Sequence, residues 1–166
     1  MHALKVVSDT TPILSLIKID KVHLLHELYG TVIVPHAAYL EIEAGKSKDY
    51  YYADLHTIDC IHVEKISSLP RPPSPFGLNA GEAETIILAC EQSADLVIID
   101  EKCGRRYAKQ KNLPVTGTIG ILLKAKQQGF IDAVRPLLNE LNRKHSWLSD
   151  SLVKKALMLA DELTDR

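Results

Sequence analysis

The fold can be inferred from one stretch near the N-terminus, Lys5-Val6-Val7-Ser8-Asp9-Thr10-Thr11-Pro12. Its apolar half predicts a short buried strand, and its polar half predicts an immediate turn into a helix. Thr11 can cap that helix through its hydroxyl, and Pro12 lies in the first turn, where a missing N–H is tolerated. Ligands of open α/β sheets bind beyond the carboxyl ends of the strands, so Asp9 is placed to hold a metal or a phosphate-bearing ligand. The same aspartate also suits a plain turn, because a negative charge is favourable beside a helix N-terminus.

Short apolar runs alternate with amphipathic helices along the rest of the chain. The runs predict strands at 31–34, 58–66, 96–99 and 113–116. Helices are expected at 13–17, 20–30, 35–45, from 79, after 101, and at 118–128, 132–143 and 149–163. Such alternation predicts a mostly parallel sheet with helices on both faces. We therefore expect a single three-layer α/β/α domain over residues 1–166, with a helical C-terminal extension.

Composition narrows the class of protein. The 166 residues are 46% hydrophobic and 25% charged, as in an ordinary globular domain. A net charge of −1 supplies no overall attraction for nucleic acid, so such binding needs a local basic patch. The scattered Cys60, Cys90 and Cys103 fit neither a disulfide framework nor a zinc site and suggest a reducing compartment. With no charged-then-apolar leader and no apolar run of membrane length, the expected location is the cytoplasm.

Carboxylates recur at comparable points of the expected sheet. Asp9 and the pair Asp100-Glu101 each follow a buried strand, Glu41 lies on the helix directly after a strand, and Glu82 lies in a first helical turn. In a parallel sheet these points fall along one edge, so the side chains can converge. A hard divalent cation relieves the resulting repulsion. One or two Mg²⁺ or Mn²⁺ ions held there can activate water for phosphodiester cleavage.

Each acid also has a structural explanation. Glu82 stands three residues after Asn79, which is the spacing of a capping box. Glu84 lies about 200° around the helix from Glu82, so the two cannot point the same way. Glu41 and Glu43 pose the same choice, and helical spacing alone does not resolve either pair.

A basic stripe follows the last acidic pair. Its members fall at i, i+3, i+4 and i+7 of one expected helix: Lys102, Arg105, Arg106 and Lys109. The stripe is either a solvated outer face or a contact for a nucleic-acid backbone, since it begins where a phosphate would have to pass. Thr10 and Thr11 leave a similar choice, between holding a metal-bound water and capping their helix.

Four stretches resemble, in order, the acidic motifs of PIN-domain proteins. They are Ser8-Asp9-Thr10-Thr11-Pro12, Val34-Pro35-His36-Ala37-Ala38-Tyr39-Leu40-Glu41-Ile42, Gly81-Glu82-Ala83-Glu84 and Ile98-Ile99-Asp100-Glu101. Two more, Gly104-Arg105-Arg106 and Val115-Thr116-Gly117-Thr118-Ile119-Gly120-Ile121-Leu122, are similar to the PIN-like branch once catalogued as a domain of unknown function, DUF3368. The resemblance implies an α/β/α PIN fold, a divalent metal and ribonuclease chemistry. It also implies the toxin side of a prokaryotic toxin–antitoxin pair, with a small antitoxin protein as partner.

Carried over residue by residue, the resemblance implies both the catalytic and the metal-binding set. Its members are Asp9, Glu41, Glu82 and either Asp100 or Glu101, with Glu101 favoured when one counts back from Asn112-Leu113. Glu101 stands where this branch usually has aspartate, which supports an alternative, an inactive PIN-like module that binds RNA or a protein partner.

Two further surfaces are candidates for partners. The segment Lys46–His56 carries Tyr50, Tyr51 and Tyr52, and aromatic side chains often anchor interfaces, so we expect an antitoxin to dock there. The apolar surface of the last helix either packs on its own domain, forms the seam of a homodimer or seats a partner's helix.

Overall fold

The computed structural model describes residues 3–45, 53–67, 77–144 and 148–163. Their strands form one five-stranded sheet in the order β3-β2-β1-β4-β5. The strands are β1 (Val6–Ser8), β2 (Val32–Pro35), β3 (Ile61–Glu64), β4 (Leu96–Ile98) and β5 (Val115–Thr116). Each neighbouring pair is parallel, which confirms the predicted sheet.

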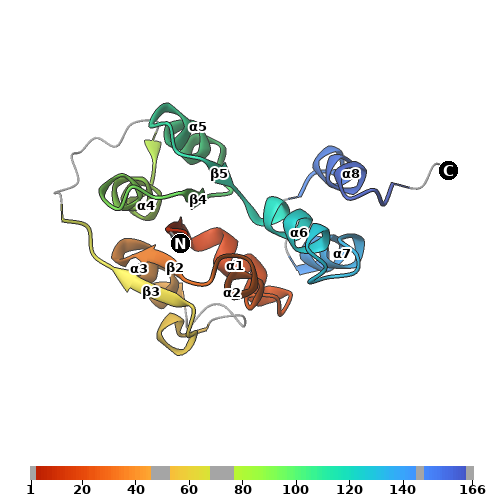
Figure 1. Cartoon of the computed structure of the whole chain (residues 1–166), viewed down its shortest axis with the longest axis horizontal. Coiled ribbons are helices and arrows are strands. Elements are labelled where there is room, and N and C mark those ends of the chain that lie inside the picture. The colour runs from red at the N-terminus through yellow and green to blue at the C-terminus, as the bar shows by residue number, and fades with distance from the viewer. Residues whose placement is uncertain (1–2, 46–52, 68–76, 145–147, 164–166) are drawn as a thin grey trace.

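Helices occupy most of the remaining described chain (Figure 1). They are α1 (Thr10–Lys18), α2 (Leu24–Tyr29), α3 (His36–Gly45), the 3₁₀ turn η1 (Leu55–Thr57), α4 (Ala80–Glu91), α5 (Lys102–Gln110), α6 (Thr118–Gln127), α7 (Arg135–Lys144) and α8 (Asp150–Leu159). Within the described ranges, no helix combines the length and the apolar character that crossing a bilayer requires.

Alternate residues of the central strands contribute to two cores. Val6 and Ile98 belong to the first, and Val7 and Val97 belong to the second. This period of two is what a sheet covered on both faces requires. The first core is completed by α1, α2, α3, α6, α7 and α8, and the second by α4 and α5. Figure 1 shows α4 and α5 on one side of β4 and α1 and α2 on the other, so the three-layer α/β/α prediction is confirmed.

The strand order creates a switch point between β1 and β4. From β1 the chain builds outward to β2 and β3, and then crosses to the opposite side of β1 to form β4 and β5. Ser8 pairs with Ile98, and the Asp9 N–H donates to the Ile98 carbonyl at 3.0 Å. The carboxyl ends of β1 and β4 are therefore side by side, which is where ligands bind in open α/β sheets.

Three local predictions are wrong. Asp20 does not begin the second helix, because its φ is +54° and α2 begins at Leu24. Thr11 is not the cap of α1, since Asp9 occupies the N-cap position and Thr11 lies inside the helix. Cys90 continues the apolar stripe of Ala83, Ile86 and Ile87, which predicts that it is buried, but it is exposed, because α4 turns a different set of side chains, including Leu88 and Ala89, into the core.

Glu162 fixes the end of the helical C-terminal extension. Its carboxylate accepts hydrogen bonds from the Val134 N–H at 2.7 Å and the Arg135 N–H at 3.0 Å, and lies 3.1 Å from Lys126 Nζ. Burial opposes ionisation, but these donors outweigh it and lower the pKa of Glu162. The residues that follow α8 are thereby bound to the helices α6 and α7.

Replacing Glu162 by Gln is expected to destabilise the protein by about 1–3 kcal/mol, the usual cost of losing hydrogen bonds to a charged group. Because the pKa of Glu162 is lowered by folding, its stabilisation is present at neutral pH and is lost as the pH falls through that pKa. Urea unfolding at pH 7 and pH 4 measures both effects. Asp161→Asn is the matched control, and an equal loss in both variants would contradict the assigned role.

Candidate active site

Asp9 lies at the centre of the edge of the sheet where the predicted acids Asp9, Glu41, Glu82, Asp100 and Glu101 are expected to meet, which we call the carboxylate edge. It follows β1 directly, and its extended backbone (φ −80°, ψ 175°) begins α1. The side chain is only 3% exposed, and Oδ1 has no hydrogen-bond partner among the described residues. A buried carboxylate oxygen without a partner is costly, and a bound cation is a standard remedy.

The surroundings of Asp9 disfavour its negative charge. Burial, together with the charges of Glu41, Glu82 and Asp100, raises the pKa of Asp9 to about 7, although the Thr10 N–H opposes the shift. Three of the predicted acids therefore face Asp9 closely enough to act on its ionisation. This is the convergence that the strand ends predicted.

Glu41 is held in place from two sides. Its Oε1 accepts a hydrogen bond from the Gly81 N–H at 2.9 Å, and its Oε2 accepts one from Thr10 Oγ1 at 3.3 Å. A Cβ atom on Gly81 would lie 2.7 Å from Glu41 Oε1, so any larger residue there would displace the Glu41 carboxylate from this position. The Thr10 hydroxyl also lies 3.3 Å from the Ala38 carbonyl, which makes Thr10 a link between α1 and α3.

The structure separates Glu82 from Glu84. The Asn79 side chain caps α4 by accepting from the Glu82 N–H at 2.8 Å, and residue Glu82 as a whole is 8% exposed. Burial and the charges of Glu101 and Glu41 raise the pKa of Glu82, which places it on the carboxylate edge. Glu84 instead accepts a hydrogen bond from the Ala37 N–H at 3.2 Å, in the first turn of α3.

The choice between Glu41 and Glu43 is resolved in the same way. Glu41 bonds to Gly81 across the edge, whereas the charge of Glu43, in addition to burial, raises the pKa of Tyr39. Glu41 is therefore the member that reaches the site.

Asp100 and Glu101 both lie at the carboxylate edge, but Asp100 is hydrogen-bonded to Thr118 whereas Glu101 is exposed. Asp100 Oδ1 accepts from the Thr118 N–H and Oδ2 from the Thr118 hydroxyl, each at 2.7 Å. Burial and Glu101 raise the pKa of Asp100, while Thr118 and Arg105 oppose the shift. Glu101 is exposed and acts on Glu82 and Asp100. Asp100 acts on the pKa of Asp9 and Glu101 acts on that of Glu82, so the preference for Glu101 as the ligand stays a prediction.

Gly81 and Thr118 lie within the family-like motifs of the sequence, but the motifs alone assign neither residue a role. Their roles depend on partners 40 and 18 positions away, which no local pattern reports. Gly117 belongs with them, because a Cβ there would lie 2.5 Å from Asp100 Oδ1.

These donors suit a hard divalent cation. No described group of three or more His, Cys, Asp or Glu side chains is arranged tightly enough to hold an ion by itself. Mg²⁺ usually keeps several waters and takes only one or two carboxylates directly, so a looser ring around a bare Asp9 oxygen fits it. The oxygen-only donor set and the partnerless Asp9 Oδ1 are the observations that support this fit.

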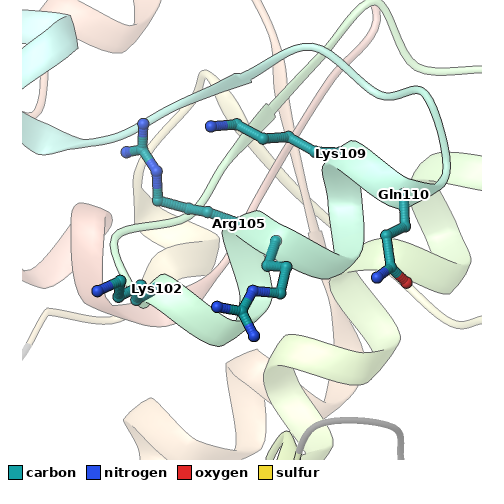
Figure 2. Close-up of a pocket in the computed structure, with 5 residues that line it drawn as sticks. Lys102, Arg105, Lys109 and Gln110 are labelled. Carbon is teal, nitrogen blue, oxygen red and sulfur yellow. The ribbon is translucent and has the colours of Figure 1, made fainter.

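The predicted substrate contacts divide into two groups. Thr10 is buried and structural, and Thr11 is exposed beside the site. The four cations of α5 line a groove of about 510 Å³ together with Gln110. Figure 2 shows Arg105 and Lys109 extending to the same side of that helix.

Comparison with known protein families identifies the family of the chain. A family model described as a PIN domain (DUF3368) matches residues 5–162. That range includes every carboxylate of the site. No curated protein matches the chain significantly.

Replacing Asp9 by Asn is expected to stabilise the metal-free protein at high pH. Because folding raises the pKa of Asp9 to about 7, the native state loses stability as the pH rises toward that value. The advantage of Asp9→Asn should therefore grow by about 1–3 kcal/mol between pH 5 and pH 8. Urea unfolding in EDTA measures it, and an advantage independent of pH would contradict the assigned burial.

Proposed function

Because the chain belongs to the PIN-domain family, whose members are generally nucleases, we propose that it is a metal-dependent endoribonuclease. One observation carries the proposal. Carboxylates from four elements converge at the switch point around Asp9, whose buried Oδ1 has no partner among the described residues. Like charges gathered in this way favour a divalent cation.

Asp9, Glu41, Glu82 and Asp100 would hold the ion, with exposed Glu101 beside them. When bound, Mg²⁺ or Mn²⁺ supplies Lewis-acid stabilisation and lowers the pKa of water. The chain's own contribution is to fix its carboxylates before substrate arrives. The Gly81 N–H fixes Glu41, and Thr118 fixes Asp100.

The cations of α5 support a polyanionic substrate. The helix begins immediately after Asp100-Glu101, and its four cations line one groove. Phosphate backbones bind such surfaces largely through charge, without reading sequence. The choice of RNA over DNA rests on the resemblance to toxin ribonucleases.

The protein partners are also proposed from the resemblance to toxin ribonucleases. We propose that the protein is the toxin of a toxin–antitoxin pair, bound by a small antitoxin protein, and that it forms a homodimer. Tyr50, Tyr51 and Tyr52 lie outside the described residues, so docking on that segment stays a prediction.

The alternative function is a PIN-like module that binds RNA or protein without cleaving. Its support is that both Asp100 oxygens are already engaged by Thr118, which leaves less of that carboxylate for an ion.

The proposed function predicts RNA cleavage that requires Mg²⁺ or Mn²⁺. Asp9→Asn removes the central ligand and should lower the cleavage rate by about 10²-fold or more. Gel analysis of a labelled RNA with and without EDTA measures it. Asp20→Asn, in an exposed turn, is the matched control. If Asp9→Asn cleaves as fast as the parent protein, the assigned site is wrong.

Thr118 provides a second test, on metal affinity. Thr118→Val removes the hydroxyl that binds Asp100 Oδ2 and should weaken Mn²⁺ binding by about 10–100-fold, as loss of a ligand's supporting hydrogen bond does. Thr118→Ser keeps the hydroxyl and should bind almost as the parent does. Isothermal titration with Mn²⁺ compares them, and equal affinity for all three proteins would exclude this positioning role.

A further inference from the structure

Helices α3 and α4 each bind the N-terminus of the other. The Ala37 N–H, in the first turn of α3, donates to Glu84 Oε1 at 3.2 Å, and the Gly81 N–H, in the first turn of α4, donates to Glu41 Oε1 at 2.9 Å. The two helices pack against each other (Figure 1). We call this reciprocal pair of hydrogen bonds the α3–α4 brace.

The two bonds of the brace join the same two helical turns. Ala37 and Glu41 are four residues apart on α3, and Gly81 and Glu84 are three residues apart on α4. At these spacings the two residues of each helix are neighbours on one side of it, about one turn apart. A shift of α3 relative to α4 therefore stretches both bonds at once.

The N-terminus of α3 depends on Glu84 for its negative charge. The N-terminus of α4 has its own supports, because the Asn79 side chain accepts from the Glu82 N–H at 2.8 Å and Glu82 is an acid in the first turn. The first turn of α3 contains no acidic residue. Since an anion stabilises the free N–H groups and the positive end of a helix, Glu84 supplies from α4 what the sequence of α3 lacks.

Glu41 is the functional side chain that the position of α3 affects. Residue 41 is exposed, so packing alone does not fix its rotamer, and its carboxylate depends on hydrogen bonds for its place. The two donors are the Gly81 N–H and the Thr10 hydroxyl, which lies 3.3 Å from Glu41 Oε2. Both donors belong to other helices, so the carboxylate meets them only while α3 keeps its position.

We propose that Glu84 is a positioning residue, which keeps Glu41 at the carboxylate edge. It acts through the Ala37 N–H and the first turn of α3, without contacting the ion. A direct role as a metal ligand would require Glu84 Oε1 to give up its bond to Ala37. The inference rests on the proposed metal-dependent function and deepens it by assigning a role to an acid outside the set that would hold the ion.

Three variants of the full chain separate positioning from other roles. Glu84→Ala removes the acceptor, whereas Glu84→Gln keeps a carbonyl oxygen that can accept from the Ala37 N–H. Glu91→Ala is the matched control, because Glu91 is also a glutamate of α4 whose carboxylate accepts a backbone N–H, that of Ser67 at 2.9 Å.

The first measurement is hydrogen exchange of the Gly81 amide, followed by NMR in EDTA. This amide donates to Glu41, so its exchange rate reports whether that carboxylate is in place. The reference is the Val97 amide, which donates to the Pro114 carbonyl within the sheet and reports general loss of stability. Glu84→Ala should raise the exchange rate of Gly81 relative to Val97 by about tenfold, and the other two variants should stay within about threefold of the parent.

The second measurement is isothermal titration with Mn²⁺. Glu84→Ala should weaken Mn²⁺ binding by about tenfold, as loss of a group that orients a ligand does. Glu84→Gln and Glu91→Ala should again stay within about threefold of the parent.

An equal loss of Mn²⁺ affinity in Glu84→Gln and Glu84→Ala would overturn the positioning role, because the Glu84 carboxylate would then be a ligand itself. Equal effects of Glu84→Ala and Glu91→Ala would also overturn it, as would a Gly81 exchange rate that follows Val97 in every variant. A Gly81 amide loosened by Glu84→Ala, in a parent protein that binds no Mn²⁺, would support the positioning of Glu41 and defeat the metal-dependent function. Mn²⁺-dependent cleavage by a chain whose Gly81 exchange ignores Glu84 would do the reverse.

Discussion

The rest of the site depends on one electrostatic constraint, the burial of the Asp9 carboxylate among other carboxylates. The strand order brings the ends of β1 and β4 together, and this places Asp9 opposite Asp100 with almost no access to water. An ionised group in such a place costs stability unless something compensates its charge. The compensation can be a proton, which the raised pKa of Asp9 reflects, or a cation. Proteins commonly accept such a cost at functional sites.

The neighbouring acids differ from Asp9 in the hydrogen-bond donors that their carboxylates receive. Glu41 receives the Gly81 N–H, and Asp100 receives two donors from Thr118 at the N-terminus of α6, where the helix dipole also favours negative charge. Asp9 is left with a bare oxygen at the centre. Glu41 and Asp100 are thus held in place by donors of the chain itself, whereas Asp9 keeps one unsatisfied oxygen.

The sequence predicts the location of this site because the strands of a parallel sheet all end at the same edge. The sequence predicts that Asp9 and the pair Asp100-Glu101 lie near each other, because strands that run in parallel end at a common edge. Helical spacing alone does not choose Glu82 over Glu84, since it separates the two side chains but does not say which faces the edge; only the resemblance to the family motifs selects Glu82. That choice depends on Ala37, which lies 47 positions from Glu84 in the chain. Cys90 was misplaced for a related reason, because helices packed on several sides bury more than one stripe.

The net charge of −1 conceals a strong separation of charge. Acids gather at one edge of the sheet, and the cations of α5 begin directly beside them. Carboxylates without a metal would repel a phosphate backbone. Positive charges can offset this repulsion only within about one Debye length, roughly 8 Å at physiological salt, because salt screens them beyond that distance. Lys102 and Arg105 share a cavity with Asp100 and so act within that reach, whereas Lys109 lies about 10 Å further along the helix from Lys102. The nearer cations therefore offset repulsion at the site itself, and the farther ones add affinity for the strand as it leaves.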